Sequence, residues 1–213
     1  MKLYCVTHKA QSNIKKIGLL PVGVGLEKFP KDYLIENTLD NIAFKNKNYS
    51  EVSFHYWIWK NILPNKKDGE WLGICQYRRY FVKKELRNKI SQINGNQGKL
   101  NIDSLTELES ILQKEPHPDW ENFDAVLCDP WSLEVQKKIK IIKRGLKSLI
   151  KNPKILFNKK NHNIKLHFDM YHGHGNLDRA IELLNDKDKN DFKDFVNTNT
   201  KLRGHSLFFC KNN

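Results

Sequence analysis

Residues 50–81 read SEVSFHYWIWKNILPNKKDGEWLGICQYRRYF and contain a predicted helix followed by a predicted strand. Ser50 suits a helix N-cap, and apolar side chains follow it at helical spacing at Val52, Tyr56, Trp59 and Leu63. Pro64 and the NKKDG stretch end this helix. The compact apolar run at 71–76 (WLGICQ) then predicts a buried strand, with residues 77–81 at its carboxyl end.

Strands and helices alternate along the rest of the chain. Further strands are predicted at residues 2–7, 17–24, 124–128 and 205–210, the strand at 124–128 being buried. Further helices are predicted at residues 83–93, 104–114, 176–185 and 189–196, with NGNQGK as a loop between the first two. This alternation predicts an α/β fold.

The composition argues against a membrane-spanning or secreted protein. No run of about 18 apolar residues occurs, and the start MKLYCVTHKA lacks the apolar segment and cleavage site of a signal peptide. We therefore expect a cytoplasmic protein. Cys5, Cys75, Cys128 and Cys210 each lie in an apolar run without zinc-like spacing, which predicts buried free thiols.

The formal charge of +13 is concentrated in one segment. Residues 135–168 contain 11 Lys and Arg and no acidic residue, and we interpret residues 132–166 as a basic amphipathic insertion. Within it, residues 137–151 predict a helix with an apolar stripe at Ile139, Ile142, Leu146, Leu149 and Ile150. Two interpretations stay open: a helix lying on an anionic membrane, or a surface helix that packs this stripe on its own domain.

Two motifs give a more specific indication. Residues 40–61 read DNIAFKNKNYSEVSFHYWIWKN, and residues 72–81 read LGICQYRRYF. Together they closely resemble a family of bacterial glycosyltransferase-like domains from capsular polysaccharide and exopolysaccharide loci. YCVTHK, PVGVG and MYHGHGNLDRAIELL resemble further segments of that family. The resemblance covers most of the chain except about residues 83–118 and 132–165.

The resemblance implies a fold and a donor. It implies a GT-A-like, Rossmann-type mixed sheet flanked by helices, in a single domain over residues 1–213 that binds a nucleotide-diphosphate sugar such as a UDP-sugar. Such ligands bind at the carboxyl ends of strands. The donor-binding residues expected there are Thr7, His8, Lys9, Asp40, Asn41, Gln76, Tyr77, Arg78 and Arg79.

The strand end at Gln76 has no DxD motif, which in many GT-A enzymes holds Mg²⁺ or Mn²⁺ on the diphosphate. Arg78 and Arg79 can neutralise phosphates instead, because a guanidinium group can donate two parallel hydrogen bonds to phosphate oxygens. We therefore predict no required metal or other cofactor. The competing interpretation makes both arginines surface ion-pair partners.

The acceptor is expected to be a growing saccharide or a lipid-linked sugar. An inverting transferase needs a base for the acceptor hydroxyl, and the candidates are Asp178, His174 and Asp169. We interpret Glu51 as a helix-capping residue. The resemblance, in which the family also has Glu at this place, leaves a role in the chemistry open.

Two alternatives to an active transferase remain. The family usually has His where this chain has Gln76, and its relatives continue beyond HSLFFCKNN into a helical segment. These departures favour a C-terminally truncated or catalytically impaired accessory protein of a polysaccharide locus. A nucleic-acid-binding protein agrees with the charge alone, because no nucleic-acid-binding motif is present, and we expect no nucleic-acid partner.

Overall fold

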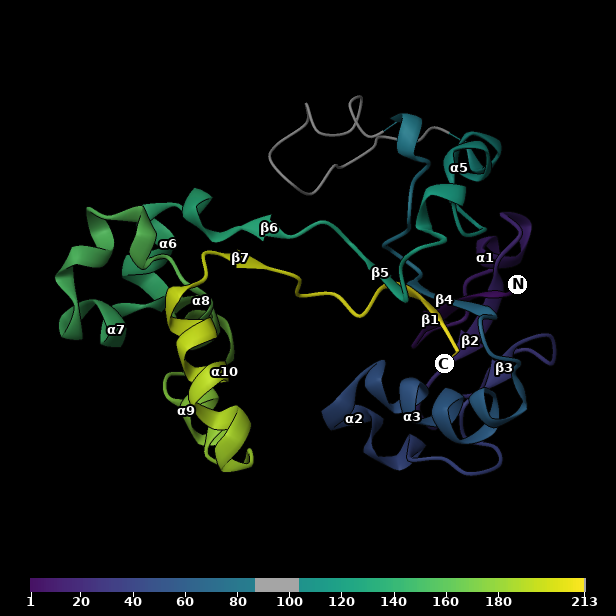
Figure 1. Ribbon diagram of the computed structural model, residues 1–213, viewed down its shortest axis with the longest axis horizontal. Helices are drawn as coiled ribbons and strands as arrows, with labels where there is room; N and C mark the ends of the chain where they lie inside the picture. The colour runs from purple at the N-terminus through teal and green to yellow at the C-terminus, as the bar shows by residue number, and fades with distance from the viewer. Residues whose placement is uncertain (87–103, 213) are drawn as a thin grey trace. The chain divides into compact units, whose positions relative to one another are not determined.

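The computed structural model describes residues 1–86 and 104–212 (Figure 1). These residues form two compact units. The first comprises residues 1–86, 104–128 and 205–212, and the second comprises residues 129–204. The second unit therefore contains the predicted basic segment and also the helices that follow it. The predicted NGNQGK loop and most of the predicted helix at 83–93 lie outside the described residues.

The first unit is built on a six-stranded mixed sheet in the order β3-β2-β1-β4-β8-β5. Four strands run parallel: β1 (Leu3–Thr7), β2 (Leu20–Gly23), β3 (Leu34–Ile35) and β4 (Trp71–Gln76). β8 (Phe208–Lys211) is antiparallel to both β4 and β5 (Ala125–Leu127). The predicted Rossmann-type mixed sheet flanked by helices is thus confirmed, and the strand at 71–76 has the predicted bounds.

Both faces of the sheet are covered, because side chains alternate between them along each strand. Leu3 and Cys5 of β1 face a core shared with α1 (Asn13–Lys16) and α5 (Leu105–Ile111). Tyr4 and Val6 face the opposite core, against α3 (Val52–Asn61). Figure 1 shows α1 and α5 on one side of these strands and α3 on the other. The remaining short elements of this unit are η1 (Ala43–Lys45), α2 (Asn46–Tyr49), η2 (Leu63–Asn65), η3 (Lys84–Leu86) and η4 (Pro118–Trp120).

The predicted N-cap and apolar face of α3 are both wrong. Ser50 has a left-handed backbone (φ 52°), and Glu51 occupies the N-cap position. The buried side chains of the helix include Phe54, Trp57 and Ile58, whereas Trp59 of the predicted stripe is 56% exposed. The sheet decides which face is buried: the Phe54 ring packs at 5.7 Å from those of Tyr4 and Trp57.

The predicted burial of two segments also needs correction. β5 lies at the edge of the sheet, and its residues Ala125 and Leu127 are exposed. Cys5 and Cys75 are buried as predicted, but Cys128 and Cys210 are only half-buried; all four thiols are free. An edge strand such as β5 has a neighbouring strand on one side only, so its apolar sequence does not guarantee its burial.

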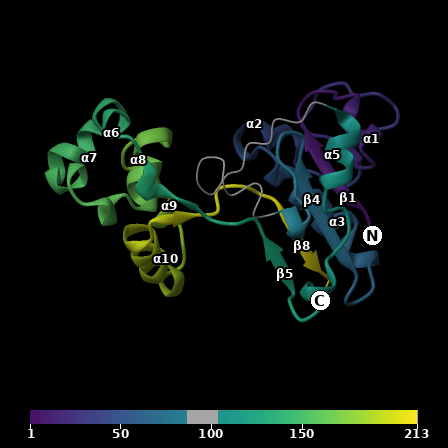
Figure 2. The same ribbon diagram turned by 90° about the horizontal axis from the view of Figure 1, so that it is seen from above.

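The second unit is mainly helical (Figure 2). Its helices are η5 (Leu133–Val135), α6 (Lys138–Arg144), α7 (Leu146–Lys151), η6 (Pro153–Leu156), η7 (Lys159–Asn161), α8 (Ile164–His172), α9 (Asn176–Ile181) and α10 (Asp186–Thr198). β6 (Trp131–Ser132) pairs with β7 (Lys201–Leu202). The single helix predicted at 137–151 is broken at Gly145, where a Cβ atom would lie 2.9 Å from the Ile141 carbonyl oxygen. None of the described helices is both long enough and apolar enough to span a bilayer.

Candidate donor site at the carboxyl ends of β1 and β4

The carboxyl ends of β1 and β4 meet at one edge of the sheet. Val6 of β1 pairs in parallel with Gln76 of β4, and the Tyr77 amide donates to the Val6 carbonyl at 3.1 Å. The segments that follow the two strands therefore leave the sheet side by side. This is the edge at which α/β sheets bind nucleotides, and it brings together seven of the predicted donor-binding residues: Thr7, His8, Lys9, Gln76, Tyr77, Arg78 and Arg79.

A tight turn fixes the segment after β4. The Gln76 amide donates to the Arg79 carbonyl at 3.1 Å, and the Arg79 amide donates to the Gln76 carbonyl at 3.0 Å. The Arg78 guanidinium lies 4.8 Å from the centroid of the Tyr77 ring. Both arginine side chains are exposed, and neither forms an ion pair within residues 1–86 and 104–212. Among the described residues, the structure therefore shows no surface ion pair of the kind considered in the competing interpretation.

Thr7 organises the segment after β1. Its buried hydroxyl donates to the Lys9 carbonyl at 2.5 Å and accepts from the Lys9 amide at 3.2 Å. This turn leaves the His8 and Lys9 side chains exposed. The His8 ring meets the Tyr77 ring edge-on at 5.3 Å, so the two turns are in direct contact.

Glu51 belongs to this cluster, although its place at the start of the helix predicted a capping role. Its side chain makes no capping hydrogen bond to α3; Oε1 accepts from Gln76 Nε2 instead. Gln76 Oε1 in turn accepts from Arg79 at 3.1 Å. Burial alone would raise the pKa of Glu51, but hydrogen bonds from Ser50, its own amide and Ser206, with His55 nearby, lower that pKa below the ordinary value. A charged Glu51 therefore holds Gln76, which holds Arg79.

The sequence contained a signal that Glu51 contributes to this cluster. Glu51 stands inside the motif at 40–61 that carries the family resemblance, four residues before His55. Burial lowers the pKa of His55, and the charge of Glu51 partly opposes that shift. His55 Nε2 is buried and has no hydrogen-bond partner among the described residues. Periodicity could not show that α3 directs Glu51 toward the end of β4.

Asp40 and Asn41 form hydrogen bonds with residues outside the cluster at Gln76. Asp40 accepts from the Tyr56 hydroxyl at 3.1 Å, and its carbonyl accepts from Asn61 at 2.8 Å. Asn41 accepts from the Ala43 amide at 3.1 Å. These bonds fasten the loop to α3 and η1. No contact joins either residue to the cluster at Gln76 within the described chain, and their donor-binding role stays a prediction.

An open hollow lies on the loops that follow β1 and β2. Tyr33 bridges these loops, since its hydroxyl accepts from the Gln11 amide at 2.7 Å and donates to the Gln11 carbonyl at 2.9 Å. None of the predicted donor-binding residues lines the hollow, whose walls are Ala10, Ser12, Lys15, Lys16, Pro30, Asp32 and Tyr33.

The three predicted catalytic residues form a separate cluster in the second unit. The Asp169 side chain is only 4% exposed and lies 3.2 Å from His174 Nδ1. Lys165 Nζ bridges Asp169 at 3.1 Å and Asp178 at 2.8 Å. Asp169 also accepts from the Gly175 amide at 3.0 Å and from Ser148 at 3.1 Å. With this many partners, Asp169 has the geometry of a residue that holds the turn between α8 and α9.

Carboxylates are sparse among the described residues at the strand ends. Glu51 is the one carboxylate in the described cluster there, and Gln76 occupies one of its oxygens. Hard cations such as Mg²⁺ require several oxygen ligands. Across residues 1–86 and 104–212, no group of three His, Cys, Asp or Glu side chains could hold a metal ion.

The family follows from a sequence comparison. The profile described as "Domain of unknown function (DUF4422)" matches residues 2–212. The chain belongs to the DUF4422 family. Curated proteins give no match to this DUF4422 chain.

A solved structure shares the fold of this DUF4422 chain. The apo structure of WbbM, a bifunctional glycosyltransferase, is similar over 99% of the chain, with a TM-score of 0.65 and 23% identity. The chain spans only 34% of the WbbM chain. The likeness shows that the two proteins share a fold.

Proposed function

We propose that this protein is a glycosyltransferase that moves a sugar from a nucleotide-diphosphate donor, a UDP-sugar, to a growing capsular or other surface polysaccharide. One observation carries the proposal: two arginines without ion-pair partners in the described chain follow β4 at the edge where β1 and β4 end in parallel. Membership of DUF4422 and the fold shared with a bifunctional glycosyltransferase support it.

The chemistry assigned to this edge is neutralisation of the leaving diphosphate. Breaking the bond between sugar and diphosphate leaves negative charge on the phosphate oxygens, and Arg78 and Arg79 supply donors for them. Lys9 adds a third positive charge from the end of β1. Glu51 and Gln76 act as positioning residues, because they fix Arg79 through two consecutive hydrogen bonds.

The acceptor side of the proposal is a saccharide or a lipid-linked sugar. Asp178, His174 and Asp169 remain the candidate bases for its hydroxyl. Asp178 is 51% exposed on its side chain and His174 is 23% exposed, so solvent reaches both, whereas Asp169 is nearly inaccessible. Asp178→Asn and His174→Gln should therefore lower the transfer rate more specifically than Asp169→Asn, which also affects folding.

Donor binding tests the proposal directly. Quenching of tryptophan fluorescence by UDP-sugars, measured with and without EDTA, gives the affinity. Replacing both Arg78 and Arg79 with Ala should weaken binding by about 3–6 kcal/mol, since a hydrogen bond to a charged group contributes about 1.5–3 kcal/mol. Arg203→Ala with Lys201→Ala, which removes two exposed positive charges from the second unit, is the matched control.

Two results would count against the proposal. Unchanged donor affinity in a folded Arg78→Ala and Arg79→Ala double variant would remove the arginines from the site. Loss of binding in EDTA, restored by Mn²⁺, would show that a metal takes their place. A protein that binds UDP-sugar without transferring or hydrolysing it would be the impaired accessory protein, a second candidate supported by Gln76 at the position of the family's usual His.

The proposed location is the cytoplasm, with attachment to the inner face of the membrane where lipid-linked acceptors reside.

A further inference from the structure

The outward face of α6 and α7 carries aliphatic side chains that the second unit leaves in solvent. Ile139 is 59% exposed, Ile142 46%, Leu146 54% and Ile150 72%. Phe157, just after η6, is 83% exposed, and its ring lies 5.8 Å from Lys138 Nζ. Four of the five predicted stripe residues are thus exposed to solvent over about half of their surface or more.

The core beneath these helices uses other residues. Ile141 is fully buried with Ile155, Leu166 and Met170, and Leu149 of the predicted stripe packs partly against them. The second unit therefore has a complete core on the inner face of α6 and α7. The exposed aliphatic residues contribute little to that core, so the packing interpretation of the stripe does not account for them.

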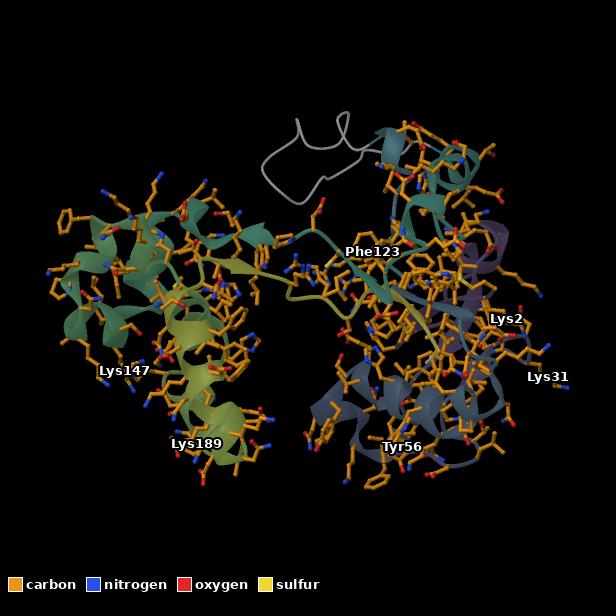
Figure 3. All side chains as sticks on the ribbon, viewed as in Figure 1. Lys2, Lys31, Tyr56, Phe123, Lys147 and Lys189 are labelled. Atoms are coloured by element: carbon orange, nitrogen blue, oxygen red, sulfur yellow. The ribbon has the colours of Figure 1, made fainter. Side chains whose placement is uncertain are left out.

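The same helices carry exposed positive charge. Six basic side chains are exposed on α6 and α7, and none of them forms an ion pair among the described residues: Lys138, Lys140, Lys143, Arg144, Lys147 and Lys151. Figure 3 shows Lys147 extending from α7. We call these six residues, with Ile139, Ile142, Leu146, Ile150 and Phe157, the basic apolar face.

The acidic residues of the second unit are placed elsewhere. No Asp or Glu occurs in residues 135–168. Asp186, Asp188, Asp191 and Asp194 all lie on α10. In Figures 1 and 2, α10 lies across this unit from α6 and α7. The unit therefore presents one side that attracts anionic surfaces and another that does not.

We infer that the basic apolar face binds the surface of an anionic lipid bilayer. Lys and Arg attract the headgroups, while aliphatic and aromatic side chains enter the boundary between headgroups and acyl chains. A nucleic acid or an acidic polysaccharide would use the charge but leave the isoleucines and Phe157 in water. The combination of both side-chain types therefore favours lipid. This inference is independent of the donor site.

Sedimentation with vesicles tests the inference on the full chain. Vesicles of phosphatidylcholine mixed with phosphatidylglycerol should bind the protein at low NaCl and release it at high NaCl, because salt screens the attraction. Vesicles of phosphatidylcholine alone should bind little. Equal binding to both vesicle types, or none to either, would overturn the inference.

Charge reversal at Lys138, Lys140, Lys143 and Lys147 to Glu should lower partitioning onto anionic vesicles at least about a hundredfold, since each lysine near such a surface contributes roughly fivefold. The matched control changes the formal charge equally through exposed lysines elsewhere: Lys2, Lys187, Lys193 and Lys201 to Glu. The control should retain most of the binding. Equal loss in both variants would show that only net charge matters.

A second variant separates lipid from other polyanions. Ile139→Ser, Ile150→Ser and Phe157→Ser leave every charge in place and alter only exposed side chains, so folding should be retained. Binding to anionic vesicles should fall about tenfold or more, because each buried aliphatic or aromatic side chain contributes more than 1 kcal/mol, while binding to heparin should not change. Unchanged vesicle binding would refute insertion. UDP-sugar affinity, measured in parallel, should not differ among the variants, so failure of this inference is distinguishable from failure of the donor site.

Discussion

Asp169 provides the sharpest test of how the second unit is held together. Asp169→Asn replaces a buried carboxylate by an amide of nearly the same size. In the native chain the Gly175 amide donates to Asp169 Oδ1 at 3.0 Å, and the amide oxygen of the variant can still accept that bond. The amide nitrogen of the variant takes the place of Oδ2, to which Ser148 and Lys165 donate in the native chain. The variant thus removes the charge and places an amide donor against the Lys165 ammonium, whereas the Ser148 hydroxyl can turn to accept from it.

The magnitude follows from what happens to Lys165. Breaking a buried ion pair costs about 3–5 kcal/mol when the partner is left uncompensated. Lys165 keeps Asp178 at 2.8 Å and is 22% exposed on its side chain, so it is not stranded. The loss should therefore be nearer that of a hydrogen bond to a charged group, and we expect Asp169→Asn to lower the free energy of unfolding by about 2–3 kcal/mol.

The pH dependence has a defined sign. Burial alone would raise the pKa of Asp169, but hydrogen bonds from Gly175, Lys165 and Ser148 and the Lys165 charge lower it below the ordinary value. A depressed folded-state pKa gives stability that is present above the unfolded-state pKa and is lost as the pH falls through the folded-state pKa. The native chain should thus lose its advantage over Asp169→Asn on acidification.

Urea denaturation followed by circular dichroism, with hydrogen exchange of peptides from α8 and α9, measures these effects. Asp191→Asn, an exposed carboxylate on α10, is the control and should change stability by less than about 0.5 kcal/mol. If Asp169→Asn keeps native stability and α8–α9 protection but loses turnover, Asp169 acts in catalysis and the structural argument is refuted.

Three further predictions concern the first unit. Burial raises the pKa of Glu36 despite opposing hydrogen bonds, so the contribution of Glu36 to stability should be lost as pH rises through that pKa. Glu36→Gln should reduce this loss in urea denaturation measured across pH, and an unchanged dependence of stability on pH would contradict the shift. Phe54→Ala removes a fully buried ring and should lower the free energy of unfolding by about 3–5 kcal/mol. Phe44→Ala, at a residue 66% exposed, should lower it by less than about 0.5 kcal/mol, and equal urea midpoints for the two variants would refute the assigned core. Cys5 and Cys75 should react with Ellman's reagent only after unfolding, and fast reaction of all four thiols in the native state would show that β1 and β4 open readily.

The sequence by itself determined the positions of most of the sheet. The strand at 71–76 has its predicted bounds, and those at 2–7 and 17–24 overlap β1 and β2. Short apolar runs bounded by turn residues are typical of buried strands, and this local pattern was enough to place them. The helix predicted at 104–114 overlaps α5, whose N-cap is Ser104: its side chain accepts from the Glu107 amide three residues along the chain.

Only the tertiary structure decided which residues meet. Glu51 and Gln76 are 25 residues apart, and their hydrogen bond exists because α3 packs across the strand that ends at Gln76. The exposed face of α6 and α7 likewise depends on Ile141 entering the core together with Met170. Periodicity shows that a helix has an apolar stripe, but the stripe is buried only if a neighbouring element covers it. That choice depends on contacts between segments distant in sequence, which local patterns do not contain.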